Sequence, residues 1–129
     1  MTRPPLARLT RVLAIAAVML CPAVARPHTS LVRSSPAARA ILEVTPHRVE
    51  LWFAERLEAA YSSVSVWSAS GARVDKQDVT VGPDDPKRLS VGVFTLRSGA
   101  YTVRYRVLSV DGHVLESSFV FTMGLRPPQ

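Results

Sequence analysis

Apolar and polar residues alternate with a period of two over much of the chain after residue 45, a pattern typical of β-strands. We expect strands at residues 49–53, 64–68, 90–96, 101–110 and 118–123, and weaker ones near Val74 and at residues 79–81. Turn-forming residues separate these segments, most clearly in Gly-Pro-Asp-Asp-Pro at 82–86. About seven short strands without a long helix predict an all-β fold, an immunoglobulin-like β-sandwich or a small barrel.

The segment before the first of these strands has no such alternation. Residues 26–39 are polar and contain two prolines, so we expect an extended arm that leads into the domain. Residues 38–44 favour a short helical turn, which Pro46 prevents from continuing.

The first 25 residues differ in character from the rest. Three arginines precede an uncharged apolar run at 12–20, and Ala-Val-Ala at 23–25 supplies the small residues that a signal peptidase requires. We therefore expect residues 1–25 to be a cleaved secretory signal and residues 26–129 to form one domain, with an uncleaved N-terminal anchor as the alternative. Cleavage would remove Cys21, the only cysteine, so no disulfide would stabilise the domain.

The charge of the chain changes with the same cleavage. The formal net charge is +6, and loss of three arginines lowers it to +3. The remaining basic residues are scattered, whereas nucleic-acid binding requires a concentrated basic patch. We expect no nucleic-acid partner and a monomer with a mildly basic surface.

Candidate chemistry concentrates at Asp111-Gly112-His113, which follows the long strand expected at 101–110. In an extended chain, side chains two residues apart leave on the same side, so a carboxylate and an imidazole would lie together. Such oxygen and nitrogen ligands suit Cu(II) or, less selectively, Zn. The alternative is an ordinary Asp-Gly hairpin turn beside a histidine that binds nothing.

The other two histidines lie in different contexts. His28 is close to the expected new N-terminus, and an extended arm can carry it back to a loop of a sandwich. The alternative for His28 is a flexible polar terminus. His47 follows Pro46 and is interpreted as a solvated loop residue.

Four segments, taken in order, resemble one known family. They are the histidine-led opening at 28–37, the segment 46–55, the pair of segments 99–103 and 107–113 that ends in Asp-Gly-His, and Phe-Val-Phe at 119–121. The chain is similar over nearly its whole mature length to the CopC-type periplasmic copper-binding, copper resistance proteins.

This resemblance implies a seven-stranded Greek-key β-sandwich that binds Cu(II) through His28, Asp111 and His113. Glu55 matches an acidic residue that lies near the metal in some family members. The implied role is that of a periplasmic copper carrier or buffer without enzymatic activity, acting beside an inner-membrane copper transporter.

Two other classes of function stay open. One is a copper oxidase with an N-terminal histidine brace, but Arg26 and Pro27 precede His28, which argues against a histidine at the exact terminus. The other is a metal-free immunoglobulin-like interaction module.

Overall fold

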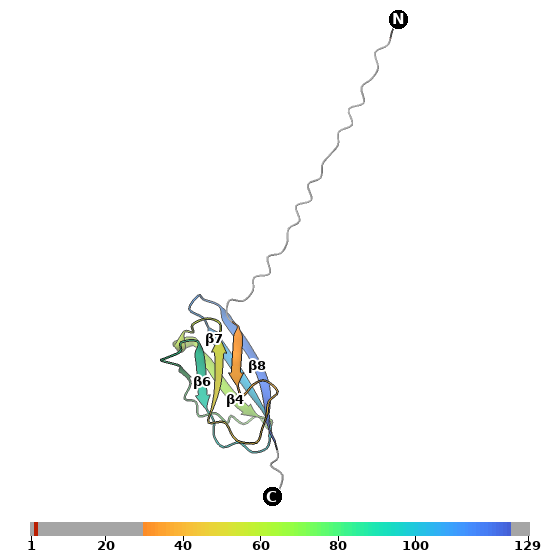
Figure 1. Ribbon diagram of the computed structural model, residues 1–129, viewed down its shortest axis with the longest axis vertical. Coiled ribbons are helices and arrows are strands. Elements are labelled where there is room, and N and C mark those ends of the chain that lie inside the picture. Colours follow the sequence, from red (N-terminus) through yellow and green to blue (C-terminus); the bar gives the residue numbers. More distant parts are fainter. Residues whose placement is uncertain (1, 3–29, 125–129) are drawn as a thin grey trace.

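Two four-stranded β-sheets make up the domain in the computed structural model, which describes residue 2 and residues 30–124 (Figure 1). The elements are β1 (Leu31–Ser35), β2 (Ile41–Leu42), β3 (Arg48–Phe53), the 3-10 helix η1 (Ala59–Tyr61), β4 (Ser63–Ser68), β5 (Thr80–Val81), β6 (Arg88–Gly92), β7 (Gly99–Leu108) and β8 (Val114–Met123). The all-β sandwich expected from the sequence is confirmed, with eight strands in the described part where about seven were expected. Nothing in residues 30–124 forms a helix that is long and apolar enough to span a membrane.

The strands are ordered β1-β3-β6-β5 in one sheet and β2-β8-β7-β4 in the other. Every pairing is antiparallel except that of β2 with β8, which is parallel. The longest pairing is the β7–β8 hairpin, whose register runs from Gly99 opposite Met123 to Leu108 opposite Val114. This hairpin carries Asp111 and His113 at its turn.

The core consists of the inward-facing residues of both sheets, as strand alternation requires. In β7 the buried positions are Tyr101, Val103, Tyr105 and Val107, each separated by one outward residue. The same core cluster includes, from other elements, Val49, Leu51, Phe53, Val64, Val66, Leu89, Val91 and Phe121. Full burial of each aliphatic side chain stabilises the fold by about 1.5–3 kcal/mol, so apolar packing holds the two sheets together.

The start of the domain differs from expectation in two ways. Within the segment 26–39, expected to be an extended arm, Leu31–Ser35 is extended but forms a strand that pairs with β3 at the edge of its sheet. Residues 38–44 form no helical turn, because the chain lies along the edge of β8 and places Ile41–Leu42 in a short parallel strand. The N–H of Arg39 donates to Val120, and the carbonyl of Ala40 accepts from Thr122. These hydrogen bonds to β8 determine the conformation of residues 38–44 more strongly than local helix propensity does.

Two strand boundaries also differ from expectation. β8 begins at Val114, four residues before the expected start, because β7 pairs with it along its whole length. β6 ends at Gly92 instead of residue 96, although Val93 and Leu96 remain in the core.

Asp75 is the one buried charged residue of the described chain. Its Oδ2 accepts the N–H of Val66 and the Nε–H of Arg73, each at 2.9 Å, and its Oδ1 accepts the N–H of Gln77 at 3.0 Å. This carboxylate ties the segment after the Gly71 turn to β4.

Candidate metal centre

The turn that joins β7 to β8 spans residues 109–113 and lies at one end of the sandwich. The N–H of Ser109 donates to the carbonyl of His113 at 2.9 Å, and the N–H of Gly112 donates to the carbonyl of Ser109 at 2.9 Å. Gly112 has φ +90°, a conformation that side-chain-bearing residues rarely adopt. A closed turn, and not an extended strand, therefore sets the positions of Asp111 and His113.

The carboxylate of Asp111 and the imidazole of His113 meet across this turn. The Nδ1 of His113 lies 3.1 Å from Oδ1 of Asp111, and the two side chains are 49% and 35% exposed. The pair is therefore accessible from solvent at the tip of the hairpin.

Hydrogen bonds keep Asp111 ionised. The hydroxyl of Ser109 donates to Oδ1, and His113 adds a side-chain and a backbone hydrogen bond. In that order of importance these contacts lower the pKa of Asp111 to about 2, because they favour the charged form. At neutral pH the turn presents a carboxylate.

The contact between Asp111 and Nδ1 has a consequence for metal binding. The Nδ1 of His113 and the carboxylate of Asp111 are 3.1 Å apart, close to the separation of two neighbouring ligand atoms that each lie about 2 Å from one metal ion. A metal ion that displaces the Nδ1 proton can therefore contact both side chains. The pair thus offers the nitrogen and oxygen donors that suit Cu(II).

Glu55 lies in the segment after β3, beside the same turn. The carbonyl of Arg56 accepts the N–H of Val110 at 3.0 Å, and Leu57 forms a bridge with Ser109. Within residues 30–124, however, no three carboxylate, imidazole or thiol groups gather closely enough to hold a metal ion. The structure brings Asp111 and His113 together and does not add Glu55 to the pair.

His28 falls outside the described residues. The described chain resumes at Ser30, whose carbonyl accepts the N–H of Ala54 at 2.9 Å. β1 therefore starts at the end of the sandwich that carries Glu55 and the β7–β8 turn, as the orange strand in Figure 1 shows.

His47 lies at the opposite end of β3 from Glu55 and is exposed, in agreement with its interpretation as a loop residue. It lines a hollow of about 570 Å³ together with Glu43, Lys76 and Phe94. That hollow holds one imidazole and one carboxylate, with a lysine whose positive charge disfavours a cation.

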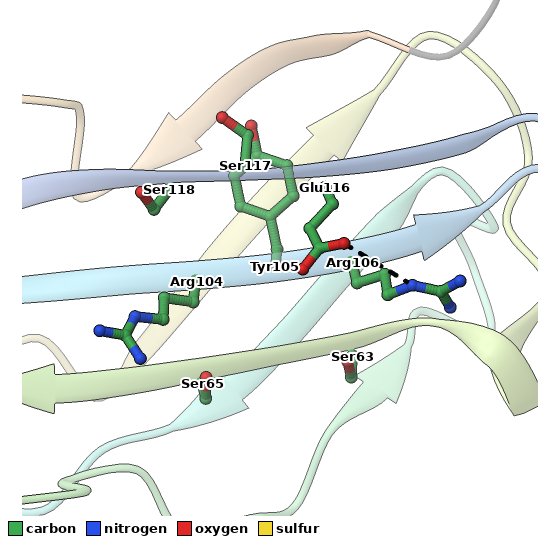
Figure 2. Close-up of a pocket in the computed structure, with 8 residues that line it drawn as sticks. All are labelled: Ser63, Ser65, Arg104, Tyr105, Arg106, Glu116, Ser117 and Ser118. Atoms are coloured by element: carbon green, nitrogen blue, oxygen red, sulfur yellow. Dashed lines mark ion pairs between the residues drawn. The ribbon is translucent and has the colours of Figure 1, made fainter.

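A second hollow, of about 460 Å³, lies on the outer face of β4, β7 and β8 (Figure 2). Its charged side chains are Arg104, Arg106 and Glu116, with serines on the flanking strands; Arg106 Nε lies 4.0 Å from Glu116 Oε2. No imidazole or thiol lines it, so the hairpin turn remains the candidate metal centre.

Sequence reasoning did not identify Ser109. This serine is 1% exposed and contacts both residues of the pair. Its only sequence signal is its position two residues before Asp111, and serine at such a position is common in ordinary turns.

The two packed sheets, with a carboxylate–imidazole pair at the tip of their longest hairpin, define the protein as an immunoglobulin-like β-sandwich. Residues 31–124 match the family model of the CopC domain, and the chain belongs to that family. The resemblance seen in the sequence is thereby confirmed.

Two curated relatives illustrate the similarity. Copper resistance protein C of Pseudomonas syringae pv. tomato is 30% identical over 112 residues, which cover 82% of this chain and 88% of the relative. Protein YobA of Escherichia coli (strain K12) is 29% identical over 97 residues, covering 74% of this chain and 78% of YobA.

Solved structures agree with the fold. CopC from Methylosinus trichosporium OB3b superposes with a TM-score of 0.69 at 36% identity, over 74% of this chain and 93% of that one. PcoC, a copper resistance protein from Escherichia coli, gives a TM-score of 0.66 at 27% identity, over 74% of this chain and 99% of that one. These matches confirm the immunoglobulin-like sandwich.

Proposed function

We propose that this protein binds Cu(II) and acts as a copper carrier or buffer in copper resistance or homeostasis, without catalytic turnover. The observation that supports this most strongly is the contact between Asp111 and His113, 3.1 Å apart at an exposed turn. The chain belongs to the CopC family, and its relatives include a protein named for copper resistance.

The proposed ligands are His28, Asp111 and His113, with Glu55 as a further acidic group. His28 precedes Ser30 by two residues, and two residues of chain reach at most about 7 Å. Ser30 is bonded to Ala54, two residues before Arg56, whose carbonyl accepts the N–H of Val110, so the described chain starts at the end of the sandwich that carries the pair, which supports His28 as a ligand. Two imidazoles and one or two carboxylates favour Cu(II) among divalent first-row ions.

The scarcity of sulfur ligands in the described residues also supports Cu(II) as the bound ion. Cu(I) prefers thiolate and thioether ligands. In residues 30–124 the only sulfur atom belongs to Met123, which is 5% exposed and lies at the far end of β8 from His113.

The proposed location is the bacterial periplasm, reached through cleavage of residues 1–25 as a secretory signal. The partner proposed for copper exchange is an inner-membrane copper transporter, and the protein would act as a monomer. The support for the location is the arginine-led apolar segment at 12–20, followed by Ala-Val-Ala.

A Cu(II) titration of the protein, secreted and processed by a bacterial host and followed by electron paramagnetic resonance, tests the proposal. We expect one tetragonal copper per chain with nitrogen hyperfine structure. His113→Ala should remove most of the affinity, while His47→Ala, at the other end of β3, should leave it unchanged.

Only free or adventitious copper in the spectrum of the wild-type protein would contradict the proposal. The interaction-module hypothesis would then gain support if neither copper nor a chelator shifted the melting temperature, since a bound metal stabilises the folded state by mass action. Peroxide production by the copper-loaded protein with a reductant would instead point to an oxidase.

A further inference from the structure

We infer that Ser109 is a positioning residue for the metal: its hydroxyl holds one carboxylate oxygen of Asp111 and leaves the other to face copper. This inference rests on the proposed function, because it concerns the same site. Ser109 is not one of the proposed metal ligands, so its role would be to orient a ligand.

Ser109 contacts both members of the pair. Its hydroxyl donates to Oδ1 of Asp111 and accepts the N–H of His113 at 3.2 Å. Its backbone N–H also donates to the carbonyl of His113 at 2.9 Å. A hydroxyl has one proton to donate, and a carboxylate is a stronger acceptor than the carbonyl of His113, which lies 3.3 Å away. The proton of Ser109 is therefore assigned to Asp111.

In the described chain, the hydrogen bonds of the Asp111 carboxylate all fall on Oδ1. Besides Ser109, they are His113 Nδ1 at 3.1 Å and the backbone N–H of His113 at 3.5 Å. With Oδ1 engaged in this way, Oδ2 is the oxygen assigned to the metal. Without the hydroxyl, the carboxylate would lose the donor that selects between its two oxygens.

The surroundings of Ser109 make it suited to this role. It is 1% exposed and forms a bridge with Leu57, which is itself 6% exposed in the core. Asp111 and His113 lie on an exposed turn, where their side chains are 35% and 49% exposed. Ser109 thus links the exposed turn to the rigid part of the sandwich, as a functional site requires of its supporting residues.

The test is Cu(II) affinity, measured by competition with a chelator, of Ser109→Ala against a matched control. Ser62→Ala is that control: Ser62 is also buried, and its hydroxyl accepts the N–H of Leu108, the residue before Ser109, at 3.2 Å. No described contact joins Ser62 to the pair. Loss of a group that orients a ligand commonly costs 10–100-fold in metal affinity, so we expect at least a tenfold loss in Ser109→Ala and little change in Ser62→Ala.

A double-mutant cycle separates positioning from a general effect on the fold. In an Asp111→Ala background, Ser109→Ala should cause little further loss of affinity, because the oxygen that it holds is gone. Ser109→Ala alone should also change the copper hyperfine splitting in the electron paramagnetic resonance spectrum. Circular dichroism of each metal-free variant verifies that the β-sandwich has formed.

The outcomes test the proposed function and the role of Ser109 separately. A wild-type protein that binds no copper would overturn the proposed function. A wild-type protein that binds copper, with Ser109→Ala binding equally well, would overturn the role of Ser109 alone. An equal loss in Ser62→Ala, or an undiminished effect in the Asp111→Ala background, would likewise overturn positioning by Ser109.

Discussion

The backbone N–H of Val110 donates to the carbonyl oxygen of Arg56 at 3.0 Å, and this bond joins the segment after β3 to the turn after β7. Glu55 is the neighbour of Arg56, so the bond places the segment that carries Glu55 beside the turn that carries the Asp111–His113 pair. The proposed metal centre therefore depends on segments that are more than 50 residues apart in sequence.

Glu55→Gln should weaken Cu(II) binding less than His113→Ala does. The substitution removes a negative charge near the proposed metal centre without removing a principal proposed ligand, so a severalfold loss of affinity is expected. Glu58→Gln provides the control, because Glu58 lies three residues further on and is exposed. Chelator competition measures both, and equal affinities for Glu55→Gln and the wild type would exclude Glu55 from the site.

Gly112→Ala should reduce both stability and copper affinity. Its φ of +90° is strained for alanine, although a Cβ there would meet no atom within 4 Å. The expected loss is about 1 kcal/mol in the free energy of unfolding. Gly71→Ala is a matched control, with φ +83° and equally open space. Both variants should lose similar stability in urea titrations, whereas only Gly112→Ala should bind copper more weakly.

Acidification should affect the metal-free protein through Asp111 only at very low pH. The folded-state pKa of about 2 lies below the ordinary 3.8, so the stabilisation is fully present above about pH 4. It is lost as the pH falls through 2. Carbon-detected NMR titration of the Asp111 carboxyl measures this pKa. In Ser109→Ala the pKa should rise towards 3.8, because the hydroxyl is the largest cause of the shift.

As the pH falls, copper binding should weaken before Asp111 becomes protonated. Protons compete with the metal for imidazole nitrogens, whereas Asp111 stays ionised down to a pH of about 2. Chelator competition at several pH values tests this order. A copper affinity that is constant until pH 3 would exclude imidazole ligation.

Asp75→Ala should be among the most destabilising substitutions in the domain. It leaves the buried N–H of Val66 and the partly buried N–H of Gln77 without their acceptor, and a buried donor without a partner costs about 1–3 kcal/mol. We expect a total loss of about 3 kcal/mol in urea unfolding. Asp84→Ala, whose side chain is 73% exposed, should change stability by less than about 0.5 kcal/mol.

Much of the fold could be predicted from the sequence because the central strands bury every second residue. Residues 49–53, 64–68 and 101–108 show this alternation and are strands in the structure. The edge strands β1 and β2 have few buried residues, so their sequences carry little alternation. Their conformation depends on hydrogen bonds to β3 and β8, which are distant in sequence.

The candidate site was predictable only in part. Asp111 and His113 were identified from their residue types, and the structure brings them together. Their orientation depends on the φ of Gly112 and on the buried hydroxyl of Ser109, and neither property can be read from residue spacing. His28 and Glu55 remain proposals.

The direction of β8 has a practical consequence for immobilising the protein. This strand begins at Val114, next to His113, and runs for ten residues to Met123, a distance of about 30 Å at the rise of an extended strand. A linker attached after Gly124 therefore leaves from the end of the sandwich opposite the Asp111–His113 pair. A sensor surface or affinity resin coupled there would leave the end that carries the proposed copper site exposed to the solution, whereas coupling ahead of β1 would crowd that end.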